Sequence, residues 1–181
     1  MADIILDNIY LILNKPEGYV SATKDNKDKT VLELVPQEYQ KRELFPAGRL
    51  DTNTTGLMII TDDGKFAHNI LAPKKHVSKK YEVIIDIPVT KEMKKGFEEG
   101  IELIDGKCKS SSLIITGKYT AEVTLTEGRY HQIKRMFGCY GAKVTKLHRT
   151  QMGKLKLPKD LEVGKTRELT PEEMEKLCQT K

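Results

Sequence analysis

An acid lies two residues after a base in a short segment of this chain that is bracketed by glycines. The segment runs from Gly48 to Gly56 with the sequence GRLDTNTTG, so that Arg49 precedes Asp51, and it leads into the apolar run LMII. Loops positioned by a rigid scaffold carry a large share of catalytic residues. An ionised carboxylate in such a loop can act as a nucleophile or as a base. By itself, however, the segment is more typical of a solvated turn, and the rest of the chain has to decide.

A second chemically dense segment, EGRYHQIKRM, spans Glu127 to Met136. Ile133 and the apolar residues three, four and seven positions later share one face of a helix, which predicts an amphipathic helix over 130–140. Lys134 and its neighbour Arg135 lie on the other face of this predicted helix. Polar side chains are therefore presented away from the core at this point.

The apolar pattern around these segments predicts short strands and helices that do not follow βαβ order. Strands are expected over 8–14, 57–61, 81–87 and 122–126. Helices are expected from the start signal at 62–64 to the stop at Pro73, over 91–99 and 130–140, and from Pro171 onward. Tyr81 lies in the third strand, on the same face as Val83 and Ile85. The strand pattern is therefore equally compatible with a core position and with a role in a site. The polar run Lys24 to Lys29 predicts a surface loop. The expected fold class is α+β, with a largely antiparallel, mixed sheet flanked by short helices.

Basic residues are unevenly distributed along the chain. Among 181 residues, 31 Lys and Arg stand against 26 Asp and Glu, which gives a net charge of +5. One basic group lies at 74–80, and a second extends from 129 to 156. Clustering of this kind is more typical of a protein that binds a polyanion than of one that binds a small neutral ligand. The length suits one domain over residues 1–181, or two closely joined lobes.

Several classes of protein are disfavoured by the sequence. Its three cysteines are widely spaced and contain no C-x-x-C pair, which predicts neither a disulfide framework nor a thiolate metal site. The histidines outside the second motif, His68, His76 and His148, show no ligand spacing, so no metal is expected. No segment reaches the roughly eighteen apolar residues of a membrane span. We therefore expect a cytoplasmic protein without membrane contact.

Four features occur in a fixed order: the turn Lys15-Pro16, the GRLD loop with the following TTGL and TDDG, the KKY of 79–81, and EGRYHQIKRMF. In this order and spacing they resemble the bacterial ribosomal RNA pseudouridine synthases, specifically the RsuA-like branch, over about Tyr10 to Thr170. The resemblance implies the pseudouridine synthase catalytic fold. It also implies an isomerisation in which the glycosidic bond of a uridine is cut and carbon 5 of the uracil is rejoined to the ribose. The resemblance implies no cofactor and no metal. The protein is expected to be a monomer, and its expected partner is ribosomal RNA or a ribosomal subunit precursor.

The resemblance assigns roles to four residues. Asp51 corresponds to the invariant aspartate of the family, which acts as a nucleophile or as a base. Burial in a closed pocket would raise its pKa, and Lys134 is expected to supply the cation that keeps it ionised. Tyr81 corresponds to the aromatic residue that stacks on the displaced uracil and whose hydroxyl can remove the proton from carbon 5. Arg49 corresponds to the residue that fills the space left when the target nucleotide swings out of its stack, with a phosphate contact or an ion pair with Asp51 as alternatives.

His131 is expected to be a structural hydrogen-bonding residue near the pocket rather than a catalytic base. Besides Arg49, several basic residues are expected to contact the RNA backbone, which adds affinity but little sequence choice. These candidates are Lys15, Lys74, Lys75, Lys79, Arg129, Lys143 and Arg149. Each of them is also compatible with a merely solvated side chain.

Many members of the family begin with a small basic RNA-binding module, which is expected to be absent here because the first catalytic strand starts so early. The amino-acid sequence HQIK at 131–134 favours small-subunit (16S) ribosomal RNA as the substrate. The alternatives are a large-subunit (23S) ribosomal RNA pseudouridine synthase and a catalytically silent ribosomal RNA-binding module, which intact Asp51, Tyr81 and Lys134 disfavour. A glycosidase-like hydrolase would need a second carboxylate, and neither Glu17 nor Asp62 has a motif reason to serve.

Overall fold

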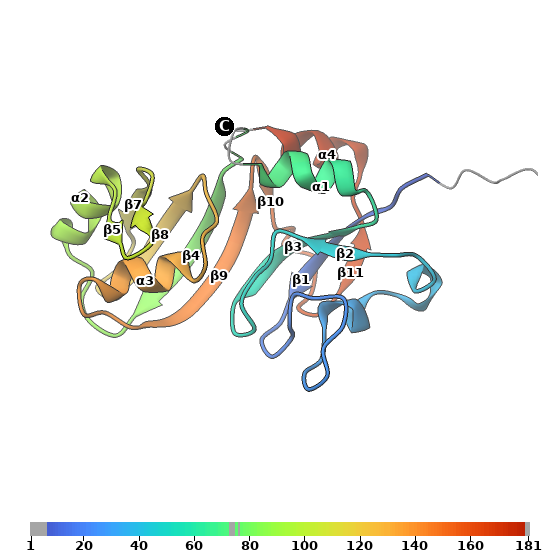
Figure 1. Cartoon of the computed structure of the whole chain (residues 1–181), viewed down its shortest axis with the longest axis horizontal. Helices are drawn as coiled ribbons and strands as arrows, with labels where there is room; N and C mark the ends of the chain where they lie inside the picture. Colours follow the sequence, from blue (N-terminus) through green and yellow to red (C-terminus); the bar gives the residue numbers. More distant parts are fainter. Residues whose placement is uncertain (1–6, 73–74, 76, 180–181) are drawn as a thin grey trace, which may run out of the picture.

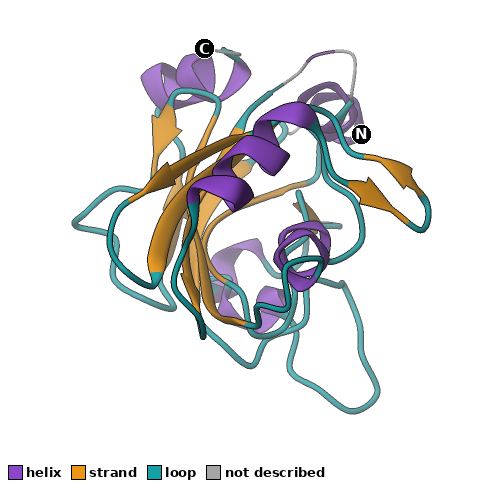
Figure 2. Ribbon diagram, turned by 90° about the vertical axis from the view of Figure 1, so that its left-hand side faces the viewer, coloured by secondary structure: helices purple, strands orange, loops and turns teal. Residues whose placement is uncertain are grey.

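The computed structural model describes residues 7–72, 75 and 77–179, which form a mixed sheet with helices on both of its faces (Figures 1 and 2). Its strands are β1 (Tyr10–Lys15), β2 (Phe45–Ala47), β3 (Thr55–Thr61), β4 (Lys79–Ile85), β5 (Glu102–Leu103), β6 (Gly106–Lys107), β7 (Ser112–Ile115), β8 (Thr120–Leu125), β9 (Val144–Met152), β10 (Leu155–Lys156) and β11 (Thr166–Glu168). Its α-helices are α1 (Gly64–Leu71), α2 (Lys91–Glu99), α3 (Gln132–Gly138) and α4 (Pro171–Cys178), and two 3-10 helices span Val31–Leu34 and Gln37–Tyr39.

Nine strands form one continuous sheet that runs through both halves of the molecule (Figure 1). Seven of them follow the order β11-β1-β3-β9-β4-β8-β7, while β2 pairs with β3 and β10 pairs with β9. In the part of the chain that the structure describes, β3 and β9 are parallel and every other pair of strands is antiparallel. The predicted α+β class with a largely antiparallel, mixed sheet is therefore confirmed.

Alternate residues of the central strands feed two separate hydrophobic cores. On β1, Leu11 and Leu13 belong to one core and Ile12 to the other. Because side chains alternate across a strand, the two cores lie on opposite faces of the sheet. Helices α2 and α3 contribute to the first core, and α1 and α4 to the second. This two-sided burial explains why β1 and β3 read as continuous apolar runs.

The predicted starts of three helices are confirmed by side chains that cap the first turn. Thr90 accepts a hydrogen bond from an amide of the first turn of α2, and Thr170 does so for α4. Asp63 caps α1 in the same way. Such caps satisfy amide groups that have no partner within the helix.

Helix α3 is shorter than the sequence predicts. It starts at Gln132 instead of position 130, because His131 adopts the left-handed backbone conformation with φ = 45°. Residues other than glycine rarely adopt this conformation, and such strain tends to concentrate at functional sites. The residues just before α3 therefore form a turn.

The central strand β9 is not predicted by the sequence. Its residues VTKLHRTQM lack a period-two apolar pattern, and yet Leu147, Arg149 and Met152 are buried. Arg149 is only 1% exposed, and its guanidinium donates hydrogen bonds of 2.8 Å to the carbonyls of Leu57 and Gly48. A buried cation thus takes the place of the apolar residue that would have revealed the strand.

The parallel pairing of β3 and β9 requires a glycine at position 56. Gly56 has φ = +111°, and a Cβ atom added there would overlap the backbone of Arg149. Position 56 lies at the end of the loop that carries Asp51, so this close approach also sets where that loop emerges from the sheet.

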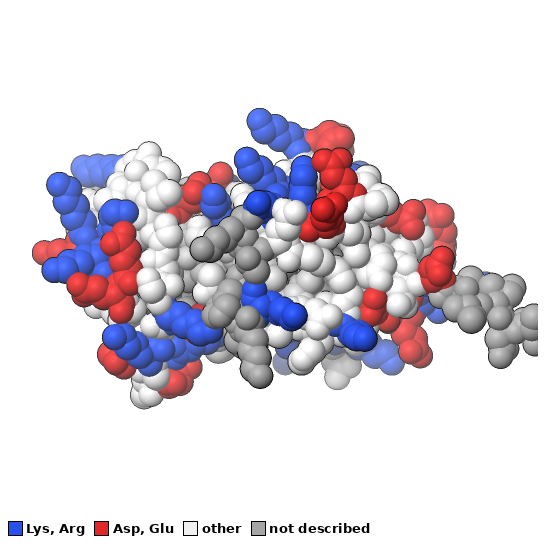
Figure 3. All heavy atoms as spheres, turned by 90° about the horizontal axis from the view of Figure 1, so that it is seen from above, with Lys and Arg blue, Asp and Glu red and all other residues white. Residues whose placement is uncertain are grey.

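The face that carries α1 and α4 has no single charged region (Figure 3). Within the described residues, no helix is long and apolar enough to cross a membrane. On the face seen from above, basic and acidic side chains are interspersed (Figure 3). This face therefore offers no continuous basic surface to a polyanion.

Candidate active site

The loop between β2 and β3 is held on both sides of Asp51 by two side chains, Lys15 at the end of β1 and Ser21 in the segment that follows β1. Before Asp51, Ser21 Oγ donates to the carbonyl of Leu50 at 2.6 Å and accepts from its amide at 3.0 Å. After it, Lys15 Nζ donates to the backbone carbonyls at positions 51, 52 and 54, at distances of 2.8 to 3.1 Å. The backbone that presents the carboxylate is therefore fixed by buried polar contacts.

Lys15 is part of the fold, and its predicted contact with RNA is wrong. Its side chain is 0% exposed and also donates to the carbonyl of Pro16 at 3.1 Å. Burial lowers the pKa of Lys15 to about 8, while Asp51 acts in the opposite direction. An ammonium group enclosed by four carbonyls cannot reach a phosphate.

Two side chains at the start of α3 reach the carboxylate of Asp51. His131 Nε2 lies 3.2 Å from Oδ1, and Lys134 Nζ lies 3.3 Å from Oδ2. Lys134 lies in the first turn of α3, whereas His131 precedes the helix in the left-handed conformation. The carboxylate side chain is 31% exposed, so it is open on its remaining side. The structure thus brings Asp51 and Lys134 together and adds His131 as a second partner, which the helical pattern of the sequence does not indicate.

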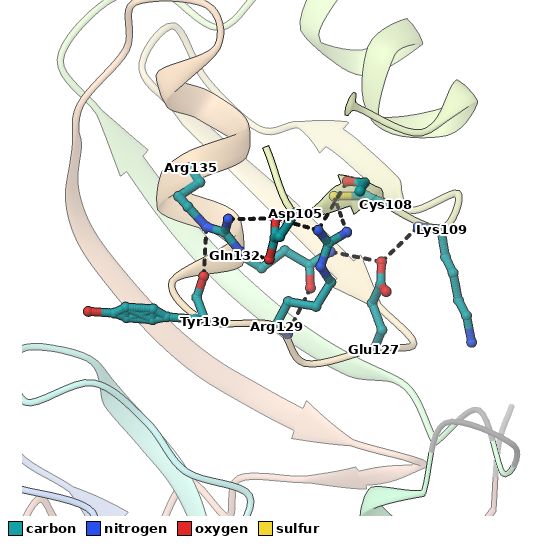
Figure 4. A network of polar contacts seen from close by, with 9 residues as sticks. Asp105, Cys108, Lys109, Glu127, Arg129, Tyr130, Gln132 and Arg135 are labelled. Carbon is teal, nitrogen blue, oxygen red and sulfur yellow. Dashed lines mark hydrogen bonds and ion pairs between the residues drawn. The ribbon is translucent and has the colours of Figure 1, made fainter. Parts of the chain in front are cut away.

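The start of α3 is anchored by a charged cluster around Asp105 in the β5–β6 hairpin (Figure 4). Asp105 Oδ1 accepts hydrogen bonds from Arg129 at 2.6 Å and from Arg135 at 2.8 Å. The hydrogen bonds from Arg135 and Arg129 lower the pKa of Asp105 to about 2. Arg135 also donates from Nε to the carbonyl of Tyr130 at 2.8 Å. The turn before α3 is thereby tied to the hairpin.

A second set of contacts in Figure 4 completes this anchor. Gln132 Oε1 accepts from the amide of Arg129 at 3.1 Å, and its Nε2 donates to Glu127 at 3.0 Å. The guanidinium of Arg129 is bound to Asp105, to the carbonyl of Gly106 and to the sulfur of Cys108. Arg129, which was expected to contact RNA, therefore has a structural role, because its donors are directed into the protein.

Tyr81 enters the site from β4. It is 8% exposed, belongs to the first core and also lines the cavity beside Asp51. The pairing register of β4 with β9 shifts between Lys80 and Tyr81, and irregularities of this kind redirect side chains. Tyr81 therefore packs in the first core and borders the cavity at the same time.

Asp51, Tyr81, His131 and Lys134 line one cavity of about 660 Å³. Within the described part of the chain, Asp51 is the single acidic side chain that lines it. The basic side chains that line it are Arg49, Lys79, Arg129, Lys134 and Arg149. A cavity with one carboxylate among several cations suits an anionic substrate that is modified at one point. Among the described residues, no three His, Cys, Asp or Glu side chains are placed to hold a metal ion.

Two more of the predicted RNA contacts are buried. Arg149 is 1% exposed and bonded to two carbonyls, which disfavours the predicted phosphate contact although the residue lines the cavity. Lys79 is 7% exposed but borders the cavity, so contact with a ligand inside it is open to this residue. Burial lowers the pKa of Lys79 to about 8, and the nearby positive charge of Arg149 contributes to the decrease.

The remaining predicted contacts are accessible or lie outside the description. Arg49 is exposed and lines the cavity, and among the described residues the ion-pair partners of Asp51 do not include it. Lys75 and Lys143 are also exposed, whereas Lys74 lies outside the described residues. Arg49 is therefore free to meet a ligand instead of neutralising the carboxylate.

A second cavity of about 600 Å³ adjoins the first. The two cavities share Thr54, Lys134 and Leu147 in their linings. Lys143 and Lys146 also line the second cavity, and in the described part of the chain no acidic side chain does. The basic lining therefore continues beyond Asp51 along the segment that leads into β9.

The fold and this cavity define a pseudouridine synthase. A solved structure described as pseudouridylate synthase is 40% identical and superposes with a TM-score of 0.89, covering 96% of this chain and 75% of that chain. The archaeal box H/ACA Nop10–Cbf5 complex contains a chain that is 18% identical and shares the fold, with a TM-score of 0.58 over 90% of this chain and 62% of that one.

Sequence comparison makes the assignment specific. A family model described as RNA pseudouridylate synthase matches residues 9–138, and this chain belongs to that family. An uncharacterized RNA pseudouridine synthase of Bacillus subtilis, YtzG, is 42% identical over 171 residues, which cover 92% of this chain and 72% of the relative. Ribosomal small subunit pseudouridine synthase A of Escherichia coli is 41% identical over 167 residues, with coverage of 91% and 72%. The predicted family and isomerase activity are confirmed.

Proposed function

We propose that this pseudouridine synthase modifies a specific uridine of small-subunit (16S) ribosomal RNA. The choice of the small subunit is supported by the 41% identity to ribosomal small subunit pseudouridine synthase A of Escherichia coli. The catalytic part of the proposal is carried by one observation, the carboxylate of Asp51 held between His131 and Lys134 at 3.2 and 3.3 Å.

Asp51 is proposed to act on the ribose of the target uridine. The reaction breaks the bond between C1′ and N1, forms a bond between C1′ and C5, removes the proton on C5 and adds a proton at N1. A carboxylate oxygen either attacks C1′ or accepts a proton from the ribose as the base departs. In both cases the oxygen must face the sugar, and the contacts from His131 and Lys134 orient the carboxylate for this purpose.

Tyr81 is proposed to hold the detached uracil and to accept the proton from its C5. Support comes from the position of its side chain, which borders the cavity next to an irregularity of the β4–β9 pairing. A ring that stacks on the free base keeps it within the cavity while C5 is brought to C1′.

Arg49 is proposed to take the place of the target base in the RNA. A nucleotide inside folded RNA must swing out before its sugar can reach a carboxylate, at a cost of a few kcal/mol. Arg49 is exposed, lines the cavity and stands two residues before Asp51, which suits a wedge. Lys75, Lys79 and Lys143 are proposed to contact phosphates, where they add affinity without sequence choice.

The alternatives differ from this proposal in ways that can be observed. A hydrolase would need a second carboxylate, whereas Asp51 is the single acid that lines the cavity within the described residues. A silent RNA-binding module would not need a carboxylate positioned by two neighbouring side chains. A large-subunit enzyme would share the whole site and differ only in the RNA that it modifies.

The deciding experiment maps pseudouridines in cells that lack this protein, by carbodiimide modification followed by primer extension. We expect one pseudouridine of 16S ribosomal RNA to disappear and to return when the parent protein is supplied. Asp51→Asn should bind RNA nearly as well as the parent but restore nothing, whereas the exposed-loop control Asp28→Asn should restore the modification. A loss confined to 23S RNA would contradict the small-subunit assignment, and restoration by Asp51→Asn would remove Asp51 from the mechanism.

A further inference from the structure

Tyr130 is an aromatic side chain displayed at the edge of the cavity. It is 68% exposed, and it nevertheless belongs to the residues that line the cavity beside Asp51. Its ring stacks on the imidazole of His131, with ring centroids 3.9 Å apart and an interplanar angle of 24°. His131 thus covers one face of the Tyr130 ring, and the rest of the side chain is exposed to solvent.

The position of Tyr130 is fixed by its neighbours. Its carbonyl accepts a hydrogen bond from Arg135, which is itself held by Asp105. The preceding residue, Arg129, is held by the same carboxylate, and the following residue, His131, has φ = 45°. In Figure 4 the ring of Tyr130 extends away from this cluster. The anchoring gives an exposed ring a defined orientation, which lowers the entropy lost when a ligand stacks on it.

The surroundings of Tyr130 fit a nucleobase better than an apolar peptide. The exposed side chain of Arg49 lines the same cavity, and so does Lys134. Cations beside an aromatic ring are the arrangement that single-stranded nucleic acid recognises, because phosphates meet the cations while bases stack on the ring. Since the target uracil is assigned to Tyr81, the base that reaches Tyr130 belongs to a neighbouring nucleotide.

We propose that Tyr130 is a stacking platform for a nucleobase adjacent to the target uridine. This inference rests on the proposed function, because it takes an RNA uridine to occupy the cavity at Asp51. Stacking on a tyrosine accepts every base, so the platform contributes affinity and holds the flanking strand in place without choosing its sequence. His131 then has two contacts, one with the ring of Tyr130 and one with Asp51.

The test is a double-mutant cycle between protein and RNA. The RNA is a short fragment around the uridine identified by mapping or, if none is identified, a short single-stranded RNA with one uridine. A second RNA carries abasic riboses on both sides of that uridine. Binding is measured by fluorescence anisotropy in the Asp51→Asn background, so that no turnover occurs. Tyr130→Leu, Tyr130→Trp and a control at Tyr119, which is 41% exposed and does not line the cavity, are compared.

We expect Tyr130→Leu to weaken binding of the base-containing RNA about tenfold and of the abasic RNA less than about twofold. Tyr130→Trp should bind at least as tightly as the parent, and Tyr119→Leu should be neutral. Equal losses for both RNAs would overturn the proposal, because they would mean that Tyr130 acts only by holding His131. An unchanged affinity, or binding of neither RNA by the parent background, would overturn it as well.

Thermal denaturation of the same variants keeps a folding defect apart from lost stacking, since an exposed side chain should leave the midpoint within about 2 °C of the parent. A negative result for Tyr130 can also be distinguished from a negative result for the proposed function. Loss of a pseudouridine from 16S RNA does not depend on Tyr130, and a base-dependent effect of Tyr130 does not depend on which ribosomal RNA is modified.

Discussion

At the residue scale, two buried lysines at the site differ in what their ammonium groups contact. Lys15 and Lys79 are 0% and 7% exposed, and burial lowers the pKa of each to about 8. Lys15 donates to four backbone carbonyls, whereas Lys79 has no hydrogen bond or ion pair through its side chain among the described residues. Burying a charge is costly unless it is paired and hydrogen-bonded. Substitution by methionine should therefore act in opposite directions at the two positions.

Lys15→Met should lower the free energy of unfolding by about 2 to 4 kcal/mol, because four carbonyls around Asp51 lose their donor. The loop would loosen, so turnover should fall as well. Urea denaturation at pH 7 measures the first effect, with the exposed-loop variant Lys27→Met as the control. A loss as small as that of the control would show that the carbonyls are satisfied in another way.

Lys79→Met should raise the free energy of unfolding by on the order of 2 kcal/mol at pH 7, because a buried ammonium group is replaced by an apolar chain of similar length. The folded-state pKa of Lys79, about 8, lies below its ordinary value of 10.5. Between these two values the unfolded chain binds a proton that the folded chain has lost, so the stability conferred by this site in the parent rises with pH. The advantage of the variant should be full below pH 8 and shrink toward pH 10.

Denaturant titrations of parent and variant at several pH values between 6 and about 10 measure this difference. A constant advantage at all pH values would exclude a protonation effect at Lys79. If the residue also contacts a phosphate, the stabilised variant should bind RNA more weakly, which is the usual exchange between stability and function at a site.

At the scale of elements, β9 lies between the two strands that position Asp51 and Tyr81. In its register Arg149 lies opposite Gly56 of β3 on one side and opposite Tyr81 of β4 on the other. The Asp51 loop leads directly into β3, and β4 carries Tyr81, so Asp51 and Tyr81 are positioned by the same strand. A disturbance between β3 and β9 should therefore affect stability and activity together.

Gly56→Ala should destabilise the protein by about 3 kcal/mol or more, because the added methyl group overlaps the backbone of Arg149 and the position requires a positive φ. Turnover should fall in the fraction that remains folded, since the Asp51 loop would be displaced from β9. Thermal denaturation and a tritium-release assay on uridine-labelled RNA measure the two effects. The control is Gly64→Ala, where no atom lies within 4 Å of the added Cβ; a similar loss there would argue against a specific clash.

The elements also differ in how well the sequence predicts them. Helices α1, α2 and α4 are predicted almost to their first residue, because Asp63, Thr90 and Thr170 act within a few residues of chain. Strand β9 is missed, since its buried residue Arg149 is a cation whose partners are supplied by Leu57 and a glycine far away in sequence. Local pattern cannot distinguish such a cation from a solvated one.

At the scale of the whole molecule, the net charge of +5 overstates what is available to RNA. Of the basic group at 129–156, Arg129 and Arg135 are bound to Asp105, and Arg149 is bonded to carbonyls. Lys143 and Lys146 remain exposed beside the second cavity. The lysines of that cavity should therefore carry more of the electrostatic attraction than the arginines.

Lys143→Ala should weaken RNA binding at low salt and reduce the slope of log affinity against log salt by about one unit, as expected for the loss of one phosphate contact. The control is Lys118→Ala, because Lys118 is exposed and lines neither cavity. Filter binding of a 16S RNA transcript over a range of salt concentrations measures both. Equal slopes for the two variants would place the RNA elsewhere on the surface.

The sequence by itself determined the family and the class of fold and indicated Asp51 as the candidate catalytic residue, because the loop motif and the α3 motif are each contiguous and their residue types are specific. It also determined the capped helices, whose signals act within single turns. Only the tertiary structure decided which basic residues are available. Lys15, Arg129 and Arg149 were turned inward by carbonyls and a carboxylate from distant segments, and His131 was brought to Asp51 by the left-handed turn before α3. The burial of a charge depends on partners that converge only when the chain has folded, and no local pattern records them.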